Sequence, residues 1–336
     1  MTSAVTMDAS GVVPVVDFGP FLDGTNRQEV ADAMLRSFQE IGFVQLVNHS
    51  LSQTDIESMF IWSRRFFSLP DEVKQLAPHP ASGTHHRGYS APGKEKVVQH
   101  VYDRDELEAL RRQAPDVKES FEVGREDNSV MPNIWLPEDA LPGFRDASLN
   151  FYWAFDKVKV HILRSIALAI GLPENYLVDN HLAADNQLRL LHYPPVSSMA
   201  LQREEVTRIG AHSDFGSITL LVQDDIGGLE VEDPHHPGDF LPVPPVQGAL
   251  LVNAGDFLMR WSNDTIRSTI HRVRAPAHAQ DDGGKIPERY SIPYFCCADF
   301  NTVVDCLPGT WSNERPKRYE PISASQYVLD RLAATY

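Results

Sequence analysis

The sequence predicts a β-rich α+β fold, in which a double-stranded β-helix (jelly roll) core follows an N-terminal αβ region. Residues 26–41 and 146–171 place apolar side chains at helical spacing, and the second of these predicts one long packing helix. From residue 186 onward, short β-branched and aromatic runs alternate with turns that contain Gly or Pro. A C-terminal helix is expected at residues 323–334.

The N-terminal region is expected to support the core. Ser52 is a good helix N-cap, and Leu69-Pro70 should stop the helix that it starts. The expected elements are strands at 13–18 and 43–47, helices at 26–41, 52–69, 71–76 and 103–113, and a loop at 78–94. Histidines in and near that loop are interpreted as solvated residues rather than a second metal site.

The remaining elements follow the same patterns. The apolar stripe of the long helix is explained by core packing and is assigned no chemistry. The clearest strands are expected at 186–192, 218–222, 229–231, 249–253, 270–275 and 289–295. We divide the chain into an N-terminal region (12–125), a connecting loop and long helix (126–185), a jelly-roll core (186–300) and a C-terminal extension (301–336).

Composition limits the classes of partner. The chain has 336 residues, of which 42% are hydrophobic, so it can bury a large core. Its formal charge of −16 argues against binding nucleic acid or an anionic membrane. Three cysteines form no disulfide framework, and no basic segment precedes an apolar run near the start. We therefore expect a cytoplasmic monomer or homodimer that acts on a small molecule.

A possible metal site lies at residues 209–222, where a tight turn leads into an apolar strand. His212 and Asp214 are two residues apart, so on a strand they would project from the same face. His271 is the best third donor. Two histidines and one carboxylate leave metal positions open, as in non-haem Fe(II) oxygenases. His-x-Asp alone is a weak signal, because a lone histidine in a strand is more often a hydrogen-bonded core residue.

A second group lies in Arg289-Tyr290-Ser291, on another alternating run. Arg289 and Ser291 share a face there, and a guanidinium beside a hydroxyl is well suited to hold a carboxylate. By itself, Arg289 could equally be a solvated charge at a strand edge.

Taken together, these residues resemble the Fe(II)/2-oxoglutarate-dependent dioxygenases, in the branch that includes isopenicillin N synthase. Within that branch the chain is most similar to the thymine 7-hydroxylase type of fungal enzyme. The resemblance covers nearly the whole chain. The motifs that support it are Arg87-Gly88-Tyr89, Lys118-Glu119-Ser120, Leu188-Arg189-Leu190-Leu191-His192-Tyr193-Pro194 and Trp261-Ser262-Asn263-Asp264-Thr265-Ile266.

The resemblance implies an oxidoreductase that uses Fe(II), 2-oxoglutarate and O2. His212, Asp214 and His271 would be the metal ligands and 2-oxoglutarate would chelate the metal. Arg289, Ser291 and Tyr193 would bind the cosubstrate. Three alternatives stay open: an oxidase of the same fold that does not use 2-oxoglutarate, a silent binding module, and a zinc hydrolase on the same ligands.

For the prime substrate, the resemblance implies oxidation of a methyl group on a planar ring. Arg189 matches the position that would hydrogen-bond ring carbonyls, and Phe295 could stack on the ring. Phe215 stands where the thymine branch has Tyr, and His86 stands where it has Asn. These departures favour an aromatic or polyketide-derived ring in fungal secondary metabolism, with a thymine or pyrimidine methyl hydroxylase as the alternative.

Overall fold

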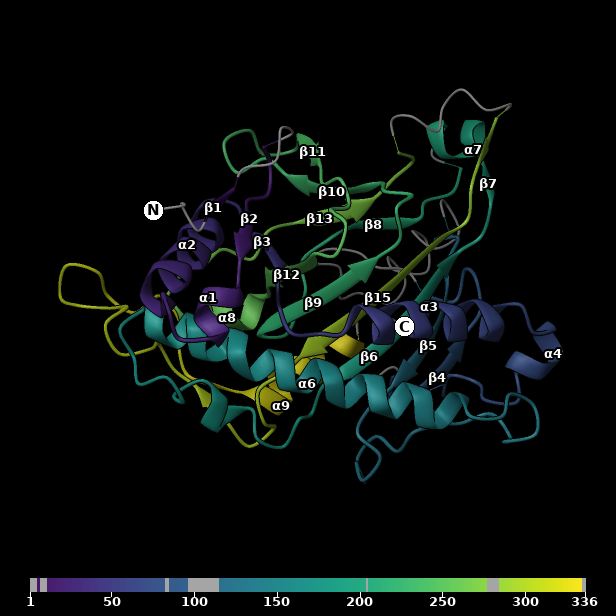
Figure 1. The fold of residues 1–336 in the computed structure, drawn as a ribbon, viewed down its shortest axis with the longest axis horizontal. Helices are drawn as coiled ribbons and strands as arrows, with labels where there is room; N and C mark the ends of the chain where they lie inside the picture. The colour runs from purple at the N-terminus through teal and green to yellow at the C-terminus, as the bar shows by residue number, and fades with distance from the viewer. Residues whose placement is uncertain are drawn as a thin grey trace.

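The computed structural model describes residues 5–6, 11–81, 85–95, 115–203, 205–276 and 284–333. Its larger sheet has the strand order β1-β2-β3-β12-β9-β15-β6-β5-β4 (Figure 1). These strands are β1 (Val5–Thr6), β2 (Val15–Asp17), β3 (Phe43–Val47), β12 (Leu250–Ala254), β9 (Ile218–Gln223), β15 (Arg289–Cys296), β6 (Gln187–Tyr193), β5 (Glu119–Val123) and β4 (Gly88–Ser90). All neighbours in this sheet are antiparallel except β2 and β3.

A smaller sheet completes the jelly roll. Its order is β11 (Phe240–Pro242), β10 (Leu229–Glu232), β13 (His271–Val273) and β8 (Ile209–His212), and all its pairs are antiparallel. A buried apolar cluster joins the two sheets, because it unites Leu191 and Tyr193 of β6 with Ile209 of β8 and Val231 of β10. Two short pairs lie apart from both sheets: β7 (Val196–Ser197) with β14 (Lys285–Ile286), and β16 (Val303–Val304) with β17 (Ile322–Ser323).

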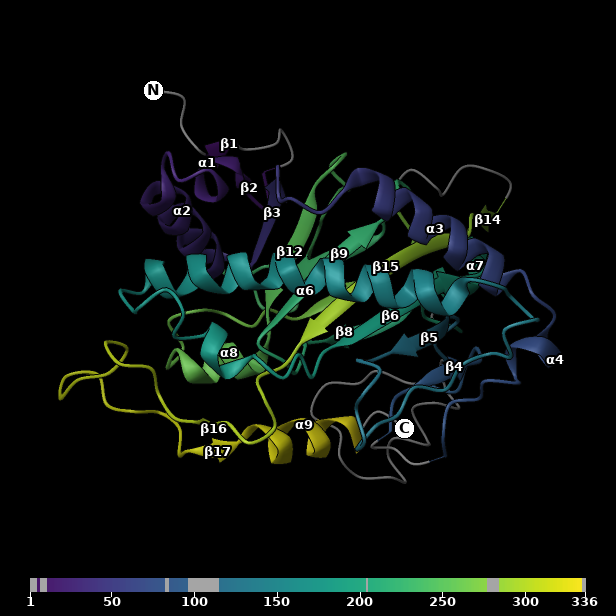
Figure 2. The ribbon, with the colours of Figure 1, turned by 60° about the horizontal axis from the view of Figure 1, so that its bottom comes forward.

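Helices flank the strands of the larger sheet (Figure 2). The helical elements are α1 (Gly19–Leu22), α2 (Arg27–Glu40), α3 (Gln53–Phe67), α4 (Asp71–Lys74), α6 (Phe144–Ala169), the 3-10 helix η1 (Val178–Asn180), α7 (Ser198–Gln202), α8 (Asp256–Trp261) and α9 (Ala324–Ala333). The largest apolar cluster includes Phe144, Phe155 and Ile162 of α6 together with Leu190 and Leu220 of the sheet. Figure 2 shows α6 and α9 on opposite sides of the strands. None of the helices within the described ranges has the length and apolar character needed to cross a bilayer.

Most of the expected elements are confirmed, including the long helix and the terminal helix. Ser52 caps α3, and its hydroxyl accepts a hydrogen bond from the Asp55 amide at 3.3 Å. The prediction of a simple loop at 78–94 is wrong, because Gly88–Ser90 forms β4 and pairs with β5. Gly88 makes this possible: its φ is +81°, and a Cβ there would lie 2.7 Å from the Ala77 carbonyl oxygen. The helix expected at 103–113 lies outside the described residues.

Candidate active site

Three side chains meet where the two sheets are joined. β8 ends at His212 and β13 begins at His271, and these two residues are direct partners in the antiparallel register. Asp214 lies in the turn that carries the chain from β8 in the smaller sheet to β9 in the larger one. The expectation that His212 and Asp214 project from the same face of one strand is therefore wrong, because Asp214 lies beyond the end of β8. The two side chains converge nevertheless.

The geometry of this group suits a metal ion. Asp214 Oδ1 lies 3.8 Å from His212 Nε2 and 3.7 Å from His271 Nε2. One ligand atom from each residue lies within 4.8 Å of the other two. Across the part of the chain that the structure describes, this is the sole group of three or more His, Cys, Asp or Glu side chains with such spacing.

Contacts with backbone carbonyls orient the two histidine side chains. Nδ1 of His212 lies 2.9 Å from the Gly210 carbonyl oxygen, and Nδ1 of His271 lies 3.2 Å from that of Thr269. Donation from Nδ1–H to these carbonyls leaves each Nε2 lone pair free to face a metal. Burial lowers the pKa of His212, which favours the neutral imidazole that coordinates metals.

Two hydrogen bonds orient the carboxylate of Asp214. Its Oδ2 accepts hydrogen bonds from Thr219 Oγ1 at 2.6 Å and from Asn253 Nδ2 at 2.7 Å, while Oδ1 faces the histidines. Burial by itself would raise the pKa of Asp214, but the two histidines and these two donors outweigh it, and the pKa is lowered. The side chain is therefore ionised, and its Oδ1 is turned toward the two histidines.

A second polar group lies deeper between the sheets. Arg289 is 1% exposed and sits opposite Tyr193 in the β15–β6 register, with its Cζ 4.9 Å from the centre of the Tyr193 ring. Its guanidinium donates to Ser291 Oγ at 3.1 Å and to Gln223 Oε1 at 2.9 Å. The structure thus brings together Arg289, Ser291 and Tyr193, as predicted, and adds Gln223.

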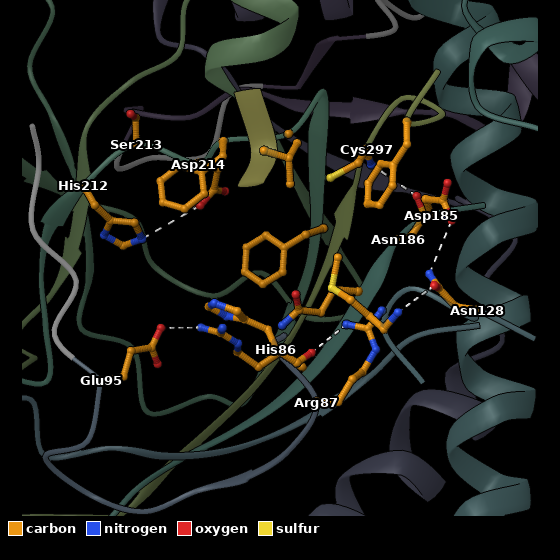
Figure 3. Close-up of a pocket in the computed structure, with 18 residues that line it drawn as sticks. His86, Arg87, Glu95, Asn128, Asp185, Asn186, His212, Ser213, Asp214 and Cys297 are labelled. Carbon is orange, nitrogen blue, oxygen red and sulfur yellow. Dashed lines mark hydrogen bonds and ion pairs between the residues drawn. The ribbon is translucent and has the colours of Figure 1, made fainter. Parts of the chain in front are cut away.

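A pocket opens beside His212 and Asp214 and encloses about 840 Å³ of space that includes open solvent. His212 and Asp214 lie at one end of it, and Arg87, Asn128 and Asp185 lie at the other (Figure 3). The four residues predicted to contact the prime substrate all line this pocket: His86, Arg189, Phe215 and Phe295. Val328 of α9 also lines it, so the C-terminal helix contributes to its wall.

Arg189 takes part in an ion-pair network in the pocket wall. Its Nη1 lies 3.0 Å from Glu95 Oε1, and its Nε lies 3.1 Å from Glu122 Oε1. Glu95 also pairs with Lys118. Burial works to raise the pKa of Glu95, but Arg189 and Lys118 outweigh it and hold that pKa well below its usual range. The Arg189 Cζ lies 5.5 Å from the centre of the Phe295 ring, which connects the network to the predicted stacking surface.

His86 differs from the sequence interpretation. It is fully buried in the pocket wall rather than solvated, and its ring lies edge-on to that of His79, with 5.2 Å between the centres. Gly88, whose conformation allows β4 to pair with β5, follows two residues later, so His86 lies directly before an edge strand of the larger sheet.

Comparisons with known proteins agree with this geometry. Residues 184–298 match the 2OG-Fe(II) oxygenase superfamily, and residues 13–138 match the N-terminal region described as non-haem dioxygenase in morphine synthesis. The chain is 36% identical to the 2-oxoglutarate-dependent dioxygenase htyE of Aspergillus rugulosus, over 96% of this chain and 99% of that protein. The chain belongs to the 2OG-Fe(II) oxygenase superfamily.

Two further relatives of this oxygenase are informative. Proline hydroxylase buaE of Petromyces alliaceus is 38% identical over 96% of this chain and 98% of its own length. The thymine 7-hydroxylase of Neurospora crassa, solved in complex with alpha-KG and thymine, is 41% identical, with a TM-score of 0.87 and 100% of both chains covered. The resemblance to the thymine 7-hydroxylase type is thereby confirmed.

The residues present fit the cofactors of the superfamily, which are Fe(II), 2-oxoglutarate and O2. Two imidazoles and one carboxylate are the donors of its mononuclear iron sites. In the part of the chain that is described, Arg289 forms no ion pair, and its Nε has no hydrogen-bond partner. A buried guanidinium in that state suits an anionic ligand such as the distal carboxylate of 2-oxoglutarate.

Sequence reasoning missed several residues of the site, among them Asn253, Thr219, Gln223 and Glu95. Asn253 and Thr219 are direct partners in the β12–β9 register, so strand pairing places both behind Asp214. Thr219 was detectable in principle, because it is the second residue of the strand expected at 218–222 and follows Asp214 by five positions. Nothing in the sequence around Glu95 connects it with Arg189, which lies 94 residues away.

Proposed function

We propose that this dioxygenase oxidises a small cyclic substrate at a ring methyl group, in fungal secondary metabolism, with His212, Asp214 and His271 as the Fe(II) ligands. One observation carries the proposal: a pocket with aromatic and guanidinium side chains in its wall reaches two of the three ligands directly. Arg289, Ser291 and Tyr193 lie outside the residues that line this pocket, so cosubstrate and prime substrate would occupy separate spaces.

The pocket residues orient the ring. Phe295 and Phe215 offer apolar faces on which a planar ring can pack. Because Glu95 and Glu122 balance the charge of Arg189, its guanidinium is suited to neutral acceptors, such as ring carbonyls, more than to a second anion. Bound Fe(II), with 2-oxoglutarate and O2, supplies the oxidising power, and succinate and CO2 are released.

Arg87 favours a second candidate class of substrate. It is 3% exposed and forms no ion pair with any described residue, and its Nη1 donates a hydrogen bond to the His86 carbonyl oxygen at 2.6 Å. A Cβ on Gly124 would lie 2.1 Å from its Nη2, so a glycine at that position makes room for the guanidinium. A ring that carries a carboxylate, as an amino acid does, would place that group at Arg87. The similarity to a proline hydroxylase is consistent with this class.

A substrate screen separates the candidates. The Fe(II)-loaded protein is incubated with 2-oxoglutarate, O2 and two panels, ring-methyl heterocycles and aromatics in one and cyclic amino acids in the other. Products gaining one oxygen are detected by mass spectrometry and succinate is measured. We expect products from the ring-methyl panel. Products from the amino-acid panel alone would replace the first candidate with the second, and products formed without 2-oxoglutarate would support the oxidase alternative.

A matched pair of variants links the result to the pocket. Arg87→Met should abolish oxidation of a carboxylate-bearing substrate and have little effect on a neutral ring. Arg189→Ala should have the opposite selectivity. Equal losses in both variants for both panels would mean that neither arginine selects the substrate.

A further inference from the structure

A second arginine lies beside the predicted cosubstrate site. Arg208 directly precedes β8, the strand that ends at the ligand His212, and its side chain is fully buried. Its Cζ lies 5.8 Å from the centre of the Tyr193 ring, and the Cζ of Arg289 lies 4.9 Å from the same ring. Two guanidiniums therefore lie against the same tyrosine ring, one from the residue before β8 and one from β15.

Among the described residues, the hydrogen-bond partners of both guanidiniums are neutral. Arg208 donates from Nη2 to the Pro287 carbonyl oxygen, and its Nε and Nη1 have no hydrogen-bond partner. The partners of Arg289 are neutral oxygens of a serine and a glutamine. No described carboxylate forms an ion pair with either arginine. Asp224 lies close enough to interact electrostatically with both arginines, but its carboxylate accepts hydrogen bonds from the amides of Tyr290 and Ile226 and forms no ion pair with either.

Two other buried arginines, Arg189 and Arg331, are paired with carboxylates. Arg189 has two carboxylate partners and Arg331 has Asp256 at 3.0 Å. Around Arg208, by contrast, the neighbouring Ile209 and Tyr193 belong to the apolar cluster between the sheets. Burying a charge without a counter-ion is costly, and two like charges close together increase that cost. Burial lowers the pKa of Arg208 to about 10, and Arg289 lowers it as well, so Arg208 remains charged at neutral pH.

We propose that Arg208 is a second cation for the distal C5 carboxylate of 2-oxoglutarate, acting together with Arg289. Three guanidinium nitrogens, Nε and Nη1 of Arg208 and Nε of Arg289, are then available to donate to that carboxylate. The inference rests on the use of 2-oxoglutarate by this superfamily and is independent of the identity of the prime substrate.

The test is a binding cycle with two ligands. 2-Oxoglutarate and 2-oxopentanoate share the chelating end, but the second lacks the C5 carboxylate. Each is titrated calorimetrically, without O2 or prime substrate, into the Fe(II)-loaded wild-type protein and Arg208→Met. We expect Arg208→Met to weaken 2-oxoglutarate binding by about 10- to 100-fold, the range for a lost charged hydrogen bond. Binding of 2-oxopentanoate should change less than about threefold, within ordinary context effects.

Two further variants complete the design. Arg208→Lys retains a charge and should fall between Arg208→Met and the wild type, which keeps the test valid if Arg208→Met fails to fold. Arg272→Met is a matched control on β13, because Arg272 is paired with Glu230 at 2.7 Å and should leave both affinities unchanged. Equal weakening of both ligands, or no weakening of 2-oxoglutarate, would overturn the proposal. Because prime substrate is omitted, failure of the proposed function would not affect this result.

Discussion

Asn253 offers a sharp test of how the proposed metal ligands are held. Its side chain is 3% exposed and donates to Asp214 Oδ2 at 2.7 Å, so Asn253→Ala leaves Thr219 as the sole remaining side-chain donor to that oxygen in the described structure. A hydrogen bond to a charged group contributes about 1.5–3 kcal/mol. If that free energy serves to orient Asp214, loss of the bond should weaken Fe(II) binding about 10- to 100-fold.

The assay is an anaerobic Fe(II) titration followed by calorimetry. Thr219→Val removes the other donor to Asp214 and should show a loss of similar size. Ser165→Ala is the control, because this serine is also fully buried but bonds to Met34 in the helical layer. Wild-type Fe(II) affinity in folded Asn253→Ala would refute the view that this amide positions the carboxylate.

Three other expectations follow from the same contacts. Arg289→Lys should raise the KM for 2-oxoglutarate at least tenfold, because lysine cannot make the bidentate contact of a guanidinium with a carboxylate. The KM for the prime substrate should stay nearly unchanged. Steady-state kinetics with each substrate varied in turn measure both values. Arg189→Ala should suppress substrate oxidation about 10- to 100-fold while uncoupled decarboxylation of 2-oxoglutarate continues, measured as CO2 release against product; parallel loss of both would place Arg189 in the fold or the cosubstrate site. Burial lowers the pKa of His181 to about 3, so below about pH 6.5 the unfolded chain binds a proton that the folded protein does not. Stability should therefore decrease by about 2 kcal/mol between pH 6.5 and pH 5, and His181→Gln should reduce that slope in urea unfolding; an unchanged slope would contradict the assignment.

Local patterns in the sequence were sufficient for the helices and most strands of the core. The stripe along residues 146–171 and the cap at Ser52 depend on neighbours a few positions away, and both predictions are confirmed. The segment 78–94 depends on a distant strand instead. Its residues 88–90 form β4 only because β5 pairs with them about 30 positions later, so composition alone indicated a loop.

The candidate site shows the same division. His212, Asp214 and His271 could be chosen from residue type and spacing, but the reason given for the first two was incorrect, because the turn after His212 passes from one sheet to the other. Gly216 permits that turn, since a Cβ there would lie 2.4 Å from the Cys296 carbonyl oxygen. The roles proposed for Asn253 and Arg208 could not be predicted from the sequence, because they depend on strand pairing and burial.

The most direct test of the central claim is an anaerobic Fe(II) titration of the wild-type protein, His212→Ala, Asp214→Ala and His271→Ala. The wild type should bind a single equivalent of Fe(II). Each folded variant should lose at least about 100-fold in affinity and all succinate formation, because a neighbouring group cannot replace a lost metal ligand. Wild-type Fe(II) affinity in any of the three folded variants would contradict the account.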